Sequence, residues 1–153
     1  IKAFFHASSP ERTENIDQIW GGEKLPYLVS VENKEAEDYQ NRYSTVKLTF
    51  EEFKNKLKEN YNASNICDED IKKTCINEYT TSGRVKNIKV GDLIVSAEKL
   101  RTIFGLKSTN FSINIDENTI CFNVVGYGHG VGLSQVGANY LAQNGMSAEE
   151  IIK

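Results

Sequence analysis

Three stretches of the chain carry apolar residues at the spacing of an amphipathic helix. The first follows Thr49, a good N-cap residue, and Glu52 completes a capping box three positions later. Its apolar side chains share one face, as expected of core residues: Phe50, Phe53, Leu57 and Tyr61. The spacing predicts a helix over residues 50–60, and similar signals predict two more, over residues 97–104 and 135–144.

Strand-forming segments on either side of short turns predict two hairpins. Around the turn at residues 116–118, the flanking segments 111–115 and 120–124 alternate along their whole length. Residues 75–79 and 84–90 are separated by a short Thr/Ser/Gly turn and form the second pair. Together these elements predict an α+β fold of mostly antiparallel strands with several short helices, arranged to form a groove.

The N-terminal segments lack a regular pattern. Residues 8–15 are polar, and Pro10 disfavours helix at the residue before it. We interpret residues 8–20 as a surface loop pinned by a few apolar residues. Residues 33–42 are polar and charged, and we interpret them as a loop without a chemical role.

Composition limits the classes of function. The chain has 153 residues, of which 39% are hydrophobic and 25% charged, as in an ordinary globular domain or a large part of one. A net charge of −3 argues against nucleic-acid binding, which depends on clustered Lys and Arg. No apolar run approaches the roughly 20 residues that span a bilayer, so we expect any anchor or signal outside this chain.

The cysteines and histidines do not form a recognisable metal-binding pattern. Of the three cysteines, Cys67 and Cys75 are near enough in sequence to pair, but spacing alone leaves that open, and Cys121 lies far from both. The two histidines, His6 and His129, are distant in sequence, and no C-x-x-C pair is present. We predict no metal and no cofactor bound by this chain.

The most unusual segment is residues 126–135, GYGHGVGLSQ, in which glycine first occupies every second position. Alternating glycines permit positive φ values and a close approach of the backbone to a ligand. Two interpretations stay open: a ligand-binding loop, or a tight loop packed against the preceding hairpin with His129 filling space. The spacing disfavours a phosphate loop, since neither G-x-x-x-x-G-K-[ST] nor G-x-G-x-x-G is present in order.

A Ser-His-carboxylate triad is a further catalytic alternative. Its nucleophile and base would come from Ser8, Ser9 or Ser134 and from His6 or His129. The G-x-S-x-G elbow is incomplete, because residues 132–136 read GLSQV and lack the second glycine. A serine that caps the helix over residues 135–144 is a sufficient explanation of that position.

Two segments carry specific motifs. Residues 5–13 read FHASSPERT and are followed by Trp20, and residues 126–138 read GYGHGVGLSQVGA. They resemble the F-H-S-x-S-G-G-x-T and G-Y-G-H-G-V-G-M-S-Q-x-G-A patterns of the stage II sporulation protein D (SpoIID/LytB) family. The resemblance runs through most of the chain and implies that residues 1–153 are the C-terminal portion of a single SpoIID-like domain.

The resemblance also has departures. Ala7, Pro10 and Glu11 stand where the family pattern has Ser, Gly and Gly. A proline restricts the backbone of this loop, so the resemblance does not extend to amide contacts with sugar at these positions.

The resemblance implies a peptidoglycan lytic transglycosylase that acts during sporulation and engulfment. Such an enzyme cuts glycan strands between N-acetylmuramic acid and N-acetylglucosamine and leaves a 1,6-anhydro end. In the family, a glutamate on a helix before the F-H-S-x-S strand is the general acid/base. That helix and the family's zinc-binding Cys/His segment have no counterpart here, so we expect both upstream and this chain alone to be inactive. We interpret Glu11, Glu78 and Glu98 as surface carboxylates.

The chain itself would supply the sugar groove, which needs short polar side chains, backbone amides and an aromatic platform. The candidate substrate-binding residues are His6, Ser8, Ser9, Tyr127, His129, Ser134 and Gln135. Some have structural alternatives: hydrogen bonding for the histidines, helix capping for Ser134, and packing over the hairpin for Tyr127.

Partners and location follow from the same resemblance. We expect peptidoglycan glycan strands, the N-terminal part of the same domain, a cell-wall amidase and a membrane-anchor partner, with no nucleic acid. The location would be extracytoplasmic and cell-wall-facing, with anchoring through a segment outside this chain. The alternative function is a non-catalytic cell-wall-binding or amidase-enhancer module.

Overall fold

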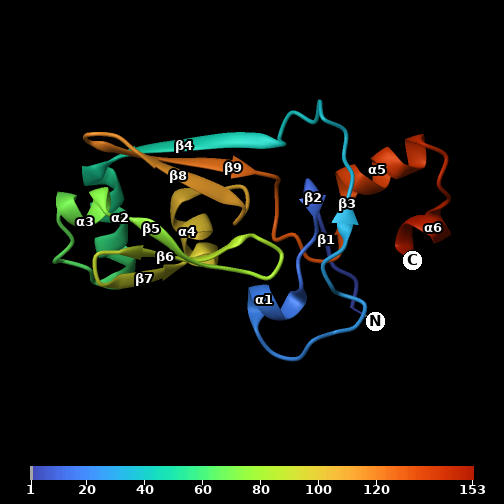
Figure 1. Cartoon of the computed structure of the whole chain (residues 1–153), viewed down its shortest axis with the longest axis horizontal. Helices are drawn as coiled ribbons and strands as arrows, with labels where there is room; N and C mark the ends of the chain where they lie inside the picture. Colours follow the sequence, from blue (N-terminus) through green and yellow to red (C-terminus); the bar gives the residue numbers. More distant parts are fainter. Residues whose placement is uncertain (1) are drawn as a thin grey trace. The chain divides into compact units, whose positions relative to one another are not determined.

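The computed structural model describes residues 2–153 (Figure 1). The chain divides into two compact units. Unit 1 comprises the chain up to Tyr43 together with Val125–Lys153, and unit 2 is the continuous segment Ser44–Val124. Short helices combine with mostly antiparallel strands, which confirms the predicted α+β class.

Unit 2 is built around two three-stranded sheets. One has the order β4-β9-β8 and the other the order β5-β6-β7. Their strands are β4 (Tyr43–Thr49), β5 (Cys75–Tyr79), β6 (Val85–Val90), β7 (Leu93–Ser96), β8 (Phe111–Ile115) and β9 (Thr119–Val125). The hairpins β5-β6 and β8-β9 are both antiparallel, as predicted.

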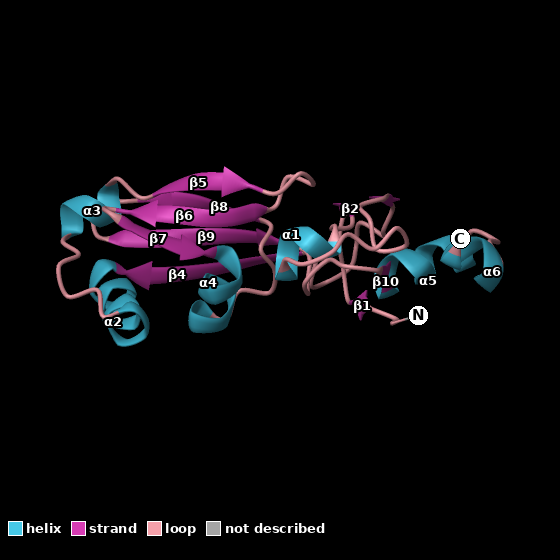
Figure 2. Cartoon of the chain, turned by 90° about the horizontal axis from the view of Figure 1, so that it is seen from below, coloured by secondary structure: helices cyan, strands magenta, loops and turns pink. Residues whose placement is uncertain are grey.

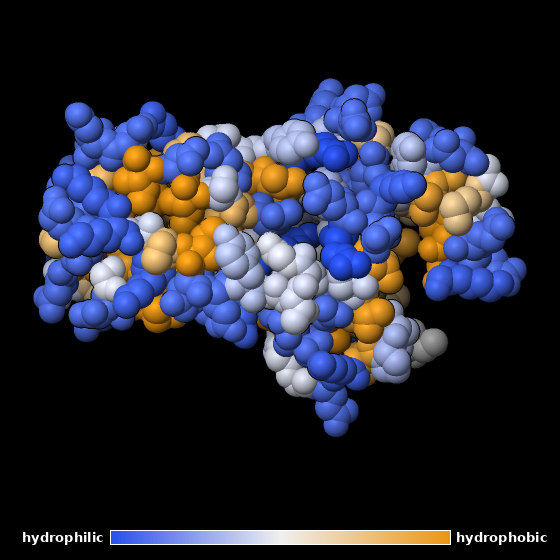
Figure 3. Space-filling view, in the orientation of Figure 1, coloured by the Kyte–Doolittle hydropathy of each residue, from blue (hydrophilic) through white to orange (hydrophobic). Residues whose placement is uncertain are grey.

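Three helices complete unit 2: α2 (Phe50–Tyr61), α3 (Asp68–Lys72) and α4 (Ala97–Phe104). Helices α2 and α4 lie on the same side of the strands (Figure 2). Their apolar faces enclose an aromatic cluster in which the rings of Phe53 and Phe104 stack with centroids 5.1 Å apart, and Phe122 lies 6.2 Å from Phe53. The surface in Figure 3 is mostly polar, with apolar residues exposed among the polar ones.

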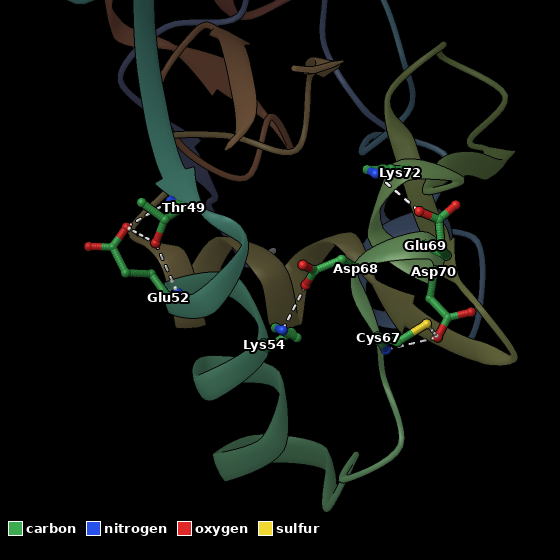
Figure 4. Close-up of polar contacts among 8 residues, drawn as sticks. All are labelled: Thr49, Glu52, Lys54, Cys67, Asp68, Glu69, Asp70 and Lys72. Carbon is green, nitrogen blue, oxygen red and sulfur yellow. Dashed lines mark hydrogen bonds and ion pairs between the residues drawn. The ribbon is translucent and has the colours of Figure 1, made fainter. Parts of the chain in front are cut away.

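The ends of α2 follow from its capping residues, as predicted. The Thr49 hydroxyl accepts a hydrogen bond from the Glu52 N–H at 3.2 Å, and the Glu52 carboxylate accepts one from the Thr49 N–H at 2.8 Å (Figure 4). Together they satisfy N–H groups that have no partner within the helix. The helix ends at Asn62, whose φ of 52° is left-handed.

Unit 1 contains short strands and three helices. Strand β1 (Phe5–His6) pairs with β10 (Leu133–Ser134), and β2 (Glu11–Arg12) pairs with β3 (Glu32–Asn33). Its helices are α1 (Ile16–Trp20), α5 (Gln135–Gln143) and α6 (Ala148–Ile152). No helix within residues 2–153 is both long and apolar enough to cross a bilayer.

The interpretation of residues 8–20 as a surface loop is wrong. Residues Ile16–Trp20 form a helix, and Ser8, Ser9, Thr13 and Glu14 are buried. Many of their hydrogen-bond partners lie outside the segment, in residues 31–35 and in the glycine-rich loop. Local polarity therefore gave no sign of their burial.

Candidate functional site

The pairing of β1 with β10 brings the two motif segments together. His6 lies opposite Ser134 in a parallel register. Just beyond β1, Ser8 and Tyr127 exchange two backbone hydrogen bonds of 2.9 and 2.8 Å. Four of the seven candidate residues are thus positioned by main-chain pairing, although more than a hundred positions separate the two segments in sequence.

The glycines of this element are required by its close approach to the N-terminal segment. Gly128 has a φ of 111°, and a Cβ there would lie 2.8 Å from the Cβ of His6. At Gly132, with φ of 74°, a Cβ would overlap the carbonyl oxygen of Phe4. A side chain at either position would both strain the backbone and separate the two segments. The loop is therefore tight, and it packs against the segment around β1.

One residue, Val131, links the two histidines through its backbone N–H and carbonyl. The Val131 carbonyl accepts a hydrogen bond from Nδ1 of His6 at 3.2 Å, and the Val131 N–H donates to Nδ1 of His129 at 3.1 Å. In a neutral His129 the proton is consequently on Nε2. The two rings lie with centroids 5.8 Å apart.

Aromatic side chains surround His129. The ring of Trp20 lies 5.0 Å from the imidazole, and the ring of Phe4 lies 5.2 Å from Trp20. Trp20 is 50% exposed, so one side of this cluster faces solvent. Trp20 forms part of the N-terminal motif, yet sequence reasoning did not single it out as a binding residue.

Glu35 is the residue that ties the candidate serines together, and sequence reasoning missed it. Its carboxylate accepts hydrogen bonds from the hydroxyls of Ser8 and Ser134, both at 2.5 Å. It also accepts from the Ser9 N–H at 2.6 Å and the Asn33 amide at 2.8 Å. Glu35 lies in a polar run without periodicity or motif, so the sequence alone offered no signal for it.

The seven candidates fall into two groups by exposure. His6, Ser8, Ser9 and Ser134 are buried, whereas Tyr127 is 41% exposed, Gln135 is exposed and His129 is half-buried. Ser134 combines both roles considered for it, because its hydroxyl donates to Glu35 and accepts the Gly137 N–H at 3.1 Å as the N-cap of α5. The buried group forms the support, and the second group presents surface.

A second layer of contacts fixes the glycine-rich loop. The Glu14 N–H donates to the Gly130 carbonyl at 2.8 Å, and the Glu14 carboxylate accepts the Asn15 N–H at 2.8 Å. Thr13 exchanges bonds with Val31, since its N–H donates to the Val31 carbonyl and its hydroxyl accepts the Val31 N–H, both at 2.9 Å. The segment before α1 thus contacts the loop at Gly130 and is itself held by Val31.

The three carboxylates interpreted as surface groups differ in setting. Glu11 is exposed. Glu78 accepts from Lys86 at 2.8 Å, and this bond holds the pKa of its carboxyl below the ordinary value of 4.5. Glu98 is half-buried in unit 2, and burial raises the pKa of its carboxyl above 4.5. The structure gives none of them hydrogen bonds to the candidate residues.

The described residues form neither a metal-binding cluster nor a disulfide. Within residues 2–153, no three His, Cys, Asp or Glu side chains are grouped so that they could hold a metal ion. Cys67, Cys75 and Cys121 are all free thiols, with the first two exposed. The pairing left open between Cys67 and Cys75 is therefore not formed in this structure.

Comparison with known proteins places the motifs in context. Over its full length the chain is 29% identical to stage II sporulation protein D of Bacillus subtilis and 30% identical to that of Bacillus amyloliquefaciens. Residues amounting to 48% of the chain are also 34% identical to the amidase enhancer of Bacillus subtilis, of which they cover 11%. No protein-family model matches the chain.

The full-length matches confirm the resemblance to the stage II sporulation protein D family. The chain spans only 43% and 42% of the two sporulation proteins. The similarity therefore concerns this part of the two sporulation proteins alone.

Proposed function

We infer, from the full-length relationship of this chain to stage II sporulation protein D, that it acts on the cell wall during sporulation. In this proposal unit 1 binds glycan strands of peptidoglycan. The chain would serve as the substrate-binding, C-terminal part of a lytic transglycosylase that forms 1,6-anhydro-N-acetylmuramic acid. Its location would be extracytoplasmic, with anchoring through a segment outside residues 1–153.

One observation supports this proposal most directly: the pairing of the two motif segments places His129 against the half-exposed Trp20, with Tyr127 exposed two residues before His129. Trp20 and His129 are in ring contact, and Tyr127 is held by two backbone bonds to Ser8. Sugar sites combine aromatic faces with fixed hydrogen-bond donors, because the apolar face of a sugar ring packs on an aromatic ring while its hydroxyls need polar partners.

The residues of this chain would bind and orient the glycan. The imidazole of His129 is fixed in orientation, because its Nδ1 accepts the Val131 N–H. The buried Ser8, Ser134 and Glu35 hold the loop in register, and thereby place that ring. Hydrogen-bonding groups and aromatic rings that are already fixed in place lower the entropic cost of binding and reaction.

The general acid/base is proposed to come from a glutamate outside this chain. A general acid must reach the glycosidic oxygen within hydrogen-bond distance. Glu35 is only 8% exposed and its oxygens already accept four hydrogen bonds within the chain, so it is poorly placed to reach a substrate atom. We therefore assign Glu35 to positioning.

Co-sedimentation with purified peptidoglycan tests the binding proposal. The chain should sediment with the glycan, and Tyr127→Ala should reduce the bound fraction several-fold. Tyr79→Ala is the matched control, because Tyr79 is an exposed tyrosine of unit 2, and it should bind as the unaltered chain does. Equal binding by all three proteins, or none by any, would refute the proposal.

Product analysis tests the assignment of the acid. Mass spectrometry should detect 1,6-anhydro ends when the chain is joined to the glutamate-bearing segment, and none when the chain acts alone. Release of these ends by the 153-residue chain alone would show that the acid lies within it.

A second candidate function rests on the match to the amidase enhancer. In that case the chain would stimulate a cell-wall amidase and cleave nothing. Adding it to an amidase with intact peptidoglycan should then raise the rate of stem-peptide release, and the joined protein should produce no anhydro ends. The two assays together separate the candidates.

A further inference from the structure

Helix α5 carries a row of amide side chains, of which only Gln135 is among the seven candidate residues. Gln135, Asn139 and Gln143 recur every four residues, so they lie along one face of the helix, and all three are exposed. They line a groove of about 410 Å³. Ligand pockets typically occupy about 300–1,000 Å³, so the groove has room for a small ligand or one unit of a polymer.

The opposite wall of the groove is the loop after β3. Ala36, Asp38 and Tyr39 line it, and a turn closed by the Tyr39 N–H and the Ala36 carbonyl, 3.4 Å apart, shapes the loop. β3 and this part of the chain run beside α5 in Figure 1. The walls thus come from two segments about a hundred positions apart.

The two walls are tied together at one end. Glu35, immediately before the loop, accepts the Ser134 hydroxyl at 2.5 Å, and Ser134 is the N-cap of α5. One turn further along the helix, Gly137 lies against Asn33, and a Cβ there would overlap the Asn33 amide. The groove is therefore built on rigid contacts, and it begins at Gln135 beside the candidate site.

The chemistry of the lining selects a neutral ligand. Primary amides both donate and accept, which matches the acetamido group of an N-acetylated sugar. The single charge among the lining side chains is the Asp38 carboxylate, a good acceptor for sugar hydroxyls. An acidic stem peptide would be repelled there, because no lysine or arginine lines the groove to balance its carboxylates.

We propose that this groove is a second sugar subsite, which binds a neutral N-acetylhexosamine unit of the glycan through the amide row of α5, with the half-buried Tyr39 beside it. This inference rests on the proposed function and extends the proposed binding surface along the glycan strand. A glycan that engages both surfaces gains affinity through the high local concentration of the second unit after the first has bound.

Titration with triacetylchitotriose, followed by the side-chain amide signals in ¹⁵N-correlated spectra, tests the subsite. The sugar should shift the signals of Gln135, Asn139 and Gln143. Asn139→Ala and Gln143→Ala should each weaken binding about three- to tenfold, as expected for loss of one or two hydrogen bonds. Asn114→Ala, which removes an exposed amide of unit 2, should leave the affinity unchanged.

The outcomes distinguish failure of this inference from failure of the proposed function. If the sugar binds, Tyr127→Ala weakens it and the two groove variants do not, the subsite is refuted while glycan binding stands. If no sugar binds at all, both fail. If a D-glutamate-containing stem peptide shifts the groove amides and the sugar does not, the ligand is the peptide and the sugar assignment is wrong.

Discussion

The hydroxyl of Ser134 donates a 2.5 Å hydrogen bond to the carboxylate of Glu35, a residue 99 positions earlier in the chain. This contact joins the cap of α5 to the loop after β3. Ser8 donates to the same carboxylate at 2.5 Å. Two segments that are distant in sequence therefore donate to one acceptor in a third segment, and the register of the candidate site depends on this acceptor.

Replacing Glu35 by glutamine should destabilise unit 1. The amide keeps the size of the side chain but supplies one acceptor oxygen where two are used, so buried donors lose their partners. Hydrogen bonds to a charged group contribute about 1.5–3 kcal/mol, so a loss of about 3 kcal/mol in the free energy of unfolding is expected. Urea denaturation measures it. Glu37→Gln, on an exposed residue of the same loop, should have no such effect, and equal losses would contradict the role of Glu35.

Gly132→Ala should be far more damaging than Gly145→Ala. Both glycines have positive φ, 74° and 92°, so each substitution carries the left-handed backbone cost of about 1–2 kcal/mol. Only at Gly132 would the new Cβ also overlap the Phe4 carbonyl. We expect overpacking there to lower the free energy of unfolding by an additional amount of about 1–3 kcal/mol. Comparison of the thermal melting curves of the two variants measures this difference. Similar melting temperatures would show that the loop can move away from β1.

The stability of α2 should depend on pH through Glu52. Hydrogen bonds from Thr49, foremost from its backbone, lower the pKa of the Glu52 carboxyl below 4.5. A lowered folded-state pKa means stabilisation that is present above pH 4.5 and is lost as the pH falls through the folded value. Glu52→Gln should therefore lower the melting temperature at pH 7 and match the unaltered chain at the acid end of its stability range.

Glu51→Gln is the control for that experiment. Glu51 lies in the same first turn of α2, where a negative charge favours the helix end, but it does not bond to Thr49. The difference between the two variants isolates the capping bond. If their melting temperatures fall together at every pH, the effect belongs to helix-end charge in general.

The thiols give a direct chemical check on the structure. All three cysteines are free, with Cys67 and Cys75 exposed and Cys121 partly covered. A thiol reagent should modify two cysteines quickly and the third more slowly in the folded chain. Intact mass before reduction should correspond to three thiols. A mass lower by two hydrogens would instead reveal a Cys67–Cys75 disulfide.

Much of unit 2 could be predicted from local signals. The capping box at Thr49 and the caps around α4 placed both helices to within a residue, because caps depend only on neighbours in sequence. The alternation over residues 111–124 likewise placed a hairpin. Strand β4 was missed, although Val46 and Leu48 alternate with polar residues and pack against the core.

In unit 1, local signals do not predict the contacts between distant segments. Burial of Ser8 and Ser9 depends on Glu35, and burial of Glu14 depends on the glycine-rich loop more than a hundred positions later. Nothing in the polar runs around these residues marks those contacts. Four of the seven candidate site residues are buried and support the loop. Residue type alone cannot distinguish such supporting residues from residues that contact a ligand.

The chain order of the two units has a consequence for synthesis. Unit 2 is one continuous segment, whereas unit 1 needs residues from both ends of the chain, and β1 has no partner until β10 has emerged. Contacts between distant residues close large loops and form late. We expect the candidate site to assemble after unit 2, because it needs both of these distant segments. Pulse-labelled hydrogen exchange should accordingly protect α2 before β1.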